Sequence, residues 1–222
     1  MMAEGSGNVE RLVRIADERF DAHRDANYRY TDRMLAWLLI AEWVFGVVLS
    51  LVFSPDAWEG KSRVLNIHVP LAILLGGAIV AVPVFLAFVR PGWTVTRHVI
   101  AIGQLLTSAL LIHLSGGRIE THFHVFGSLA FLAFYRDWKV LMTGTLVVVA
   151  DHFLRGTFYP ESVYGITNPE WWRFLEHAFW VVFIDIVLVI SCLRGVKEMR
   201  RLAEQSAELE AVALSHLTAG AA

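Results

Sequence analysis

The sequence predicts an all-α membrane protein, a six-helix transmembrane bundle with a further helix at each end. Two observations carry this prediction. Hydrophobic residues make up 56% of the 222 residues and the mean hydropathy is +0.52, whereas a soluble domain is about 45–50% apolar. Apolar segments near the ~20 residues needed to cross a bilayer recur six times, without alternating strand-like runs between them.

The six apolar segments are separated by short polar connections. They cover about residues 34–53, 69–89, 98–114, 119–135, 139–158 and 171–193. The fourth is the shortest, and it spans only if its ETHFH stretch lies inside the bilayer. We therefore predict three regions, which are a cytoplasmic amphipathic helix over 1–33, a six-span membrane domain over 34–193 and a cytoplasmic linker or coiled-coil helix over 194–222.

The two flanking helices differ in pattern. Residues 9–23 carry an apolar stripe with charges elsewhere, which suits a helix on the membrane surface or against a partner. They lack the apolar core of a signal peptide, so we expect them to be retained. The last span runs directly into the C-terminal helix with no intervening turn signal. After the span, apolar or small residues recur in steps of three and four, at Met199, Leu202, Ser206, Leu209 and Ala213. This weak heptad predicts a homodimer through the C-terminal helix, with a solvated charged helix as the alternative.

The positive charges predict the orientation. Arginine and lysine gather in the N-terminal arm, in the connection after the second segment, in the YRDWK turn and in the C-terminal tail. All four regions fall on one side if both termini are cytoplasmic, as the positive-inside rule requires. The single Cys192 excludes an internal disulfide and a cysteine-based zinc site, and the net charge of -2 gives no sign of nucleic-acid binding.

Histidines form the most unusual feature. Six of the nine lie in the outer half of a predicted span or at its outer end, at His68, His113, His122, His124, His152 and His177. At ~1.5 Å of rise per residue, all but His68 lie ~17–26 Å above the inner edge of their span, so they share one layer, with His68 at the rim. Glu120, Asp151 and Glu176 lie in the same layer. Ionisable groups at this depth are costly, by ~2.5–3.5 kcal/mol each, and usually functional.

A transition-metal site explains this layer most simply. Neutral imidazole binds Fe, Cu and Zn well. We expect the ligands to be His113, His122, His124, His152 and His177, with His68 a weaker candidate, and Glu120, Asp151 and Glu176 to orient imidazoles or bridge to a second metal. Structural hydrogen bonds, a proton relay and haem remain alternatives. No catalytic residue is assigned.

The ETHFH stretch poses a geometric condition. Residues two apart on a regular helix diverge by about 200°. If His122 and His124 share one ion, the backbone there must be irregular, which Gly116 and Gly117 would permit. If the backbone is a regular helix, only one of the two faces the central site.

Three polar residues lie deeper in the predicted bilayer. Glu42 and Asp185 are each ~14 Å above the inner edge of their span, and Gln104 lies at a similar level. They predict either a polar tie between the first and last spans or a route that carries a signal toward the tail. Both interpretations stay open.

The string SGGRIETHFHVFGSLAFLAFYRDWKVL, followed by VADHFLRGTFYPESVYG and WWRFLEHAFWVVFIDIVLV, resembles the multi-spanning N-terminal sensor region of bacterial chemotaxis receptors and sensor histidine kinases. The resemblance covers about residues 34–200. It implies an inner-membrane input domain that signals through its last span to a downstream module, with motif histidines at His122, His124, His152 and His177.

The sequence thus predicts a sensor domain that relays a small-molecule, gas, redox or metal signal through its last helix, rather than an enzyme. The alternatives are a membrane metalloenzyme or redox protein acting on a lipid or quinone, and a structural or proton-relay bundle.

Overall fold

The fold is almost entirely helical. A computed structural model describes the backbone of residues 2–53, 56–59, 62–65 and 67–220, and the side chains of residues 10–52, 67–213 and 216. Its elements follow in the order α1 (Met2–Phe53), β1 (Asp56–Glu59), β2 (Ser62–Leu65), α2 (His68–Pro70), the π-helical turn η1 (Leu71–Leu75), α3 (Gly76–Val89), α4 (Thr94–Leu114), α5 (Ile119–Leu132), the 3-10 turn η2 (Ala133–Tyr135), α6 (Trp138–Phe158), α7 (Glu161–Tyr164) and α8 (Arg173–Gly220).

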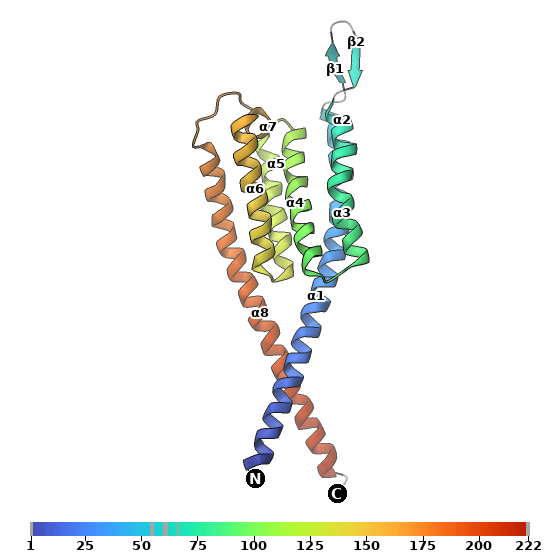
Figure 1. Ribbon diagram of the computed structural model, residues 1–222, viewed down its shortest axis with the longest axis vertical. Helices are drawn as coiled ribbons and strands as arrows, with labels where there is room; N and C mark the ends of the chain where they lie inside the picture. Colours follow the sequence, from blue (N-terminus) through green and yellow to red (C-terminus); the bar gives the residue numbers. More distant parts are fainter. Residues whose placement is uncertain (1, 54–55, 60–61, 66, 221–222) are drawn as a thin grey trace.

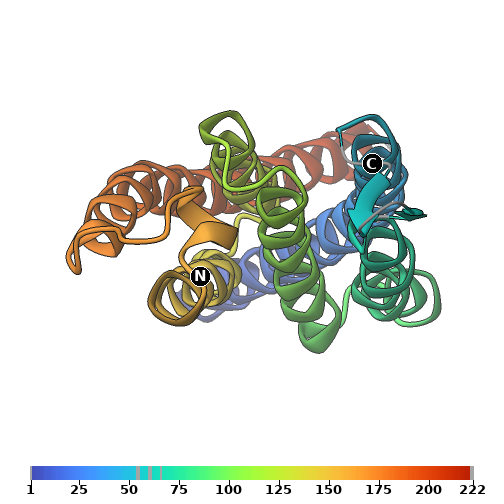
Figure 2. The same cartoon turned by 90° about the horizontal axis from the view of Figure 1, so that it is seen from above.

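Six long helices lie side by side, and both termini are at the same end of the molecule (Figure 1). Helix α4 contacts α1, α3, α5 and α6, and the view from above places it between α3 and α6 (Figure 2). Its residues Ile100, Leu105 and Ile112 are fully buried. The core therefore forms around α4, and the other helices surround it.

Within the described residues, four helices are long and apolar enough to cross a membrane. They cover Glu10–Val52, His68–Val89, Thr94–Leu114 and Arg173–Ala213. Many of their large apolar side chains are exposed, among them Phe45, Phe85, Phe183 and Val187, as expected for surfaces that face lipid. Helices α5 and α6 are outside this set, although both pack into the same bundle.

The predicted all-α class is confirmed, and one short hairpin lies outside the bundle. Strands β1 and β2 pair antiparallel, from Asp56 opposite Leu65 to Glu59 opposite Ser62. The strands have four residues each, too short to show as alternating runs in the sequence. They pair with each other and lie beyond the end of α2 (Figure 1), so the bundle itself remains helical.

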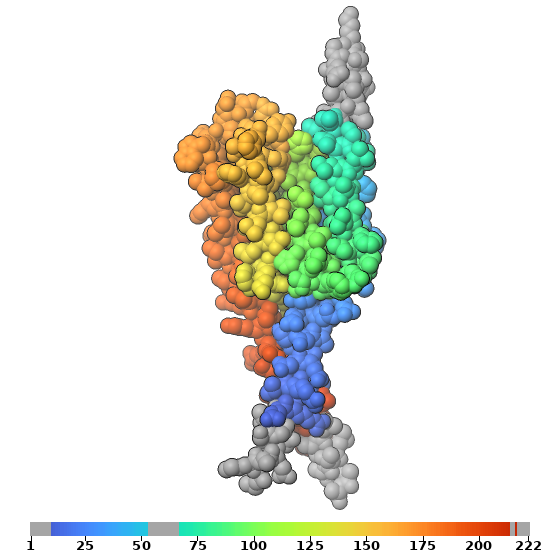
Figure 3. Space-filling view, in the orientation of Figure 1, coloured from blue at the N-terminus to red at the C-terminus, as the bar shows by residue number. Residues whose placement is uncertain are grey.

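Helix α1 differs from the prediction because the N-terminal helix is not separate from the first span. One helix runs from Met2 to Phe53, since no proline or glycine interrupts residues 8–45. Its N-terminal part packs against the end of α8, and the two leave the bundle together (Figure 3). Arg19 pairs with Glu210, and Arg200 pairs with Asp17. The N-terminal helix therefore has a partner within its own chain.

The predicted continuity of the last span with the C-terminal helix is confirmed, because α8 is unbroken from Arg173 to Gly220. The buried side of its end differs from the predicted seam, however. Met199, Ala203 and Ala207 are buried where α8 meets α1, whereas Leu202 and Leu209 are exposed. The intramolecular contact thus uses a different face from most of the heptad positions.

Candidate functional site

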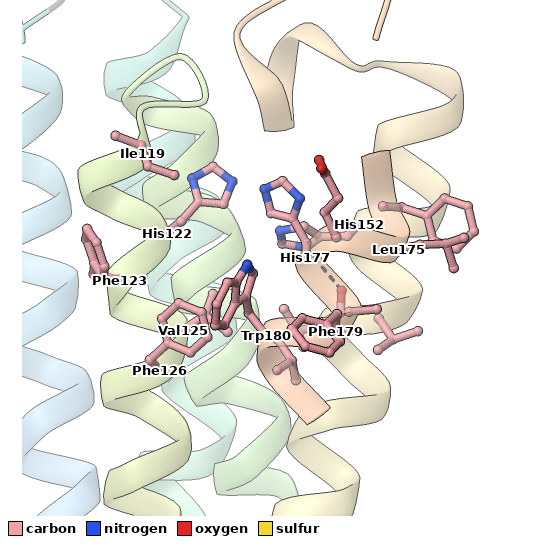
Figure 4. A pocket seen from close by; sticks show the side chains of 16 residues that line it. Ile119, His122, Phe123, Val125, Phe126, His152, Leu175, His177, Phe179 and Trp180 are labelled. Atoms are coloured by element: carbon pink, nitrogen blue, oxygen red, sulfur yellow. Dashed lines mark hydrogen bonds between the residues drawn. The ribbon is translucent and has the colours of Figure 1, made fainter. Parts of the chain in front are cut away.

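Three histidines from three helices meet near the end of the bundle that lies away from both termini, which we call its outer end (Figure 1). His122 lies on α5, His152 on α6 and His177 on α8. Their ring centroids form a nearly equilateral triangle, with sides of 5.7, 5.3 and 5.6 Å. Figure 4 shows the three rings close together in the space between these helices. We call this group the histidine triangle.

The three imidazoles share one hydrogen-bonding pattern. Nδ1 of His122 lies 2.9 Å from the Arg118 carbonyl oxygen, and Nδ1 of His152 and His177 lie 3.1 Å from carbonyl oxygens one turn back on their own helices. A carbonyl only accepts hydrogen bonds, so each Nδ1 carries the proton and each Nε2 presents a lone pair. Nε2 of His122 is buried and has no hydrogen-bond partner among the described residues.

This pattern is the one that metal-binding histidines usually show, because the donated Nδ1–H fixes the ring and leaves Nε2 to bind. No group of three or more His, Cys, Asp or Glu side chains in the described part of the chain already stands in metal-binding geometry. The triangle therefore presents three Nε2 lone pairs that could bind a metal ion. The three side chains would have to move for these atoms to reach one ion.

A salt bridge between Asp151 and Arg155 lies beside His152 of the triangle. Asp151 accepts two hydrogen bonds of 2.6 Å from Arg155, and a carboxylate oxygen lies 3.3 Å from Nδ1 of His152. The Arg155 guanidinium also donates to the hydroxyl of Ser162 on α7 and to the Ala109 carbonyl on α4. One side chain thus ties α6 to α4 and α7 beside His152.

A cavity of about 820 Å³ adjoins the triangle between α5, α6 and α8. Its walls are apolar and aromatic apart from the three histidines and Glu176. Among the lining residues, Phe126 and Phe174 are half-buried, and Phe123, Phe179 and Trp180 are exposed. The arrangement combines a few convergent polar groups with an apolar cavity, as small-molecule sites usually do.

His124 does not join the triangle. Helix α5 is regular from Ile119, so His124 faces the other way, toward α1 and α4. Its Nε2 lies 3.2 Å from Glu42, and its Nδ1 lies 2.8 Å from the Ser108 hydroxyl. Gln104 donates to both Glu42 oxygens at 2.7 Å. Of the two outcomes for ETHFH, the structure therefore has the regular helix with one histidine at the site.

His113 forms a third group with His68. Their ring centroids are 5.2 Å apart, and Nδ1 of His113 lies 2.9 Å from the Ser162 hydroxyl. These residues border a separate outer hollow with Tyr159 and Glu161. The predicted layer of histidines is thus divided among three positions, since depth along a helix does not fix the direction in which a side chain points.

The remaining predicted residues lie apart from one another. Glu120 is exposed and pairs with Arg118 at 3.5 Å, while Glu176 borders the cavity. Asp185 accepts a hydrogen bond from Thr145 instead of joining Glu42 and Gln104. The polar tie therefore links α1 to α4 and α5, and Asp185 makes a separate link between α8 and α6.

Arg155 and Ser162 were missed by the sequence analysis. The spacing of Arg155 four residues after Asp151 was a usable sign, because such residues face each other on a helix. Ser162 gave no such sign. Ser162 lies near Arg155 because α7 packs tightly against the connection that follows α4. In this contact, a Cβ added to Gly117 would come within 2.3 Å of the Gly165 nitrogen at the end of α7.

Comparison with known proteins gives one informative relative. The chain is 30% identical over 185 residues to the transducer protein Htr8 of Halobacterium salinarum, an alignment that covers 73% of this chain and 28% of the relative. The chain thus spans less than a third of that relative's length. No family model and no solved structure matches the chain. With the four long apolar helices, this similarity indicates a membrane protein of the signalling kind.

Proposed function

We propose that the chain is the membrane-embedded sensory input domain of a signalling protein, with a transition-metal site at the histidine triangle. The observation that carries the proposal is the position of His177. It belongs to the triangle and also to α8, the unbroken helix that leads out of the bundle to Gly220. A change at the site therefore acts directly on the helix that leaves the domain.

The geometry of the triangle supports metal binding. With metal–nitrogen distances of ~2.0–2.1 Å, the ring centroids of three imidazoles sharing a tetrahedral ion lie about 5 Å apart. The centroid distances of 5.3 to 5.7 Å exceed this by a few tenths of an ångström. The three rings would have to turn for their Nε2 atoms to reach one ion, and a fourth position would then remain open for a ligand. Such an open position lets a small ligand reach the metal.

We propose six membrane crossings with both termini in the cytoplasm. Helix α6 has 21 residues, enough for ~30 Å of hydrocarbon, and α5 reaches a similar length together with η2 and its flanking turns. Both helices pack against α4 and α8, which are two of the four long apolar helices. An even number of crossings agrees with the two termini lying at one end (Figure 1).

Transmission to a downstream module would use the α1–α8 pair. From His177, α8 continues for about 40 residues, or ~60 Å at ~1.5 Å per residue. Leu202, Leu209 and Val212 remain exposed on α8 beside this pair, which leaves an apolar strip for a second copy of the chain. A transducer relative supports the role of the tail as a connection to an output module.

The test of this function is metal-dependent movement of α8. With the native thiol removed by Cys192→Ser, a spin label at Leu209→Cys and another at Leu146→Cys on α6 report the distance between the two helices. We expect the distance distribution to change when metal is added to the chelated protein. The same labels in a His177→Ala background should not respond. Identical distributions with and without metal in the intact site would contradict the proposal.

A further inference from the structure

The cavity beside the histidine triangle is much larger than a metal ion and a diatomic gas require. Its volume is about 820 Å³, whereas a water molecule takes up only ~30 Å³ in the liquid. Cavities of ~300–1,000 Å³ are typical sites for small organic molecules and cofactors. The size of the cavity therefore favours an organic ligand.

With the crossings proposed above, the exposed side of the cavity faces lipid. Phe123, Phe179 and Trp180 line it and are 66%, 61% and 55% exposed, on α5 and on the most apolar part of α8. Figure 4 shows Phe179 and Trp180 just below the three histidine rings, and Phe123 farther away on the left side of α5. Exposed aromatic side chains on a membrane helix contact the bilayer, so a ligand dissolved in the bilayer reaches this cavity without entering water.

The histidines of the cavity wall accept hydrogen bonds and donate none, and the N–H donor among the lining side chains is the indole of Trp180. The Nδ1–H groups of the triangle are used by backbone carbonyls, so the Nε2 lone pairs are what the cavity presents. His122 is more than nine-tenths buried, and its Nε2 has no hydrogen-bond partner among the described residues. A buried acceptor without a partner costs free energy until a donor or a metal reaches it.

We propose that this cavity binds an aromatic hydroxyl compound from the bilayer, of the benzoquinol class. Its ring packs among Phe126, Phe174 and Trp180, and its hydroxyl meets the Nε2 atoms of the triangle. This inference rests on the histidine site proposed above and names the ligand class of that site. In metal-free protein the hydroxyl donates a hydrogen bond to an imidazole Nε2.

The same geometry predicts selection for the reduced form. A benzoquinone carries carbonyl oxygens, which only accept hydrogen bonds and therefore face the imidazole lone pairs without a donor between them. Sites that hydrogen-bond a hydroxyl discriminate strongly against analogues that lack it. We expect the quinol to bind at least on the order of tenfold more tightly than the corresponding quinone, so the bound fraction follows the redox state of the membrane pool.

The experiment uses the full 222-residue chain in phosphatidylcholine nanodiscs. A decyl-substituted dimethoxy-methyl benzoquinol, kept reduced, is the probe, and empty nanodiscs give the background. We expect saturable binding of about one probe per chain. Val149→Trp on α6 and Ala178→Trp on α8, which fill the cavity, should weaken binding by at least about tenfold. The matched controls Leu146→Trp and Val182→Trp, on the same helices but outside the cavity lining, should bind as the wild type does.

Four outcomes would overturn the inference. They are unsaturable binding, equal affinity in all four tryptophan variants, equal affinity for quinol and quinone, and a shift of the monomer–dimer equilibrium by the cavity variants with unchanged quinol affinity. The shift of the monomer–dimer equilibrium would indicate that a second copy of the chain occupies the cavity. Metal content measured on the same samples separates the two proposals. Quinol binding to protein that contains no metal as purified would refute only the metal site. Bound metal without quinol binding would refute only the proposed quinol ligand.

Discussion

The replacement Arg155→Met tests whether the salt bridge behind His152 holds the outer end of the bundle together. Arg155 makes hydrogen bonds to both Asp151 oxygens, to the Ser162 hydroxyl and to the Ala109 carbonyl. The side chains of Asp151 and Arg155 are 13% and 23% exposed. Methionine keeps the apolar stem but removes every one of these contacts and leaves the Asp151 carboxylate buried without its partner.

Breaking a buried ion pair by removing one member costs about 3–5 kcal/mol. Since about a quarter of Arg155 remains exposed, the lower end applies, and we expect unfolding to become about 3 kcal/mol easier. The double replacement Asp151→Asn with Arg155→Met removes the stranded charge as well. It should recover most of the loss, because replacing both partners of a buried pair is often close to neutral.

The rate at which a maleimide labels Cys192 measures how readily the protein opens. Cys192 is the single cysteine of the chain and is 1% exposed, so a maleimide reacts with it only after the protein opens. A loss of 3 kcal/mol corresponds to labelling about 100-fold faster under conditions in which closing outpaces reaction. Labelling of Arg155→Met within fivefold of the wild type would refute this account, as would a double variant that opens as readily as the single one.

Three further predictions use other parts of the bundle. Gly144→Ala on α6 should destabilise the folded protein by about 1–3 kcal/mol, because its Cβ would lie 2.9 Å from Leu132 and 3.0 Å from Leu105. The control Gly127→Ala on α5, whose Cβ would have nothing nearer than 4.0 Å, should not destabilise it. Thermal unfolding in detergent compares the two variants. Gln104→Leu removes the donor to both Glu42 oxygens and should cost about 2 kcal/mol by Cys192 labelling, with Ile102→Val on the exposed side of α4 unchanged. Metal retained after dialysis should fall between pH 7 and 5, since protons compete for imidazole nitrogen. The Glu170–Arg173 ion pair stays formed in this window, because hydrogen bonds from Arg173 hold the pKa of Glu170 below its usual range. The contribution of this ion pair to stability is lost only at lower pH. Constant metal content across that range would contradict imidazole ligation.

The sequence predicted the helices well because the signals for them are local. Runs of apolar residues located the membrane helices, and the absence of a break after residue 193 predicted the continuous α8. The same reasoning separated residues 1–33 from the first span, since the polarity changes there. Polarity does not end a helix, however, and α1 continues through that boundary because no helix-breaking residue is present.

The candidate site was less predictable, because it depends on rotation about the helix axes. The rise per residue placed the histidines at one level, and the angle between His122 and His124 showed that a regular helix would separate them. Which of the two would face α6 and α8 depends on how α5 packs against α4, where Ser108 and Gln104 draw His124 and Glu42 together. No pattern within α5 alone contains that information.

The most direct test of the central claim is elemental analysis of the purified chain and three variants. We expect close to one transition-metal ion per chain in the wild type and less than about a fifth of that in His152→Ala and His177→Ala, because each loses one of three ligands. The matched variant His124→Ala, outside the triangle, should keep its metal. A wild type without metal, or equal metal in all three variants, would contradict the site.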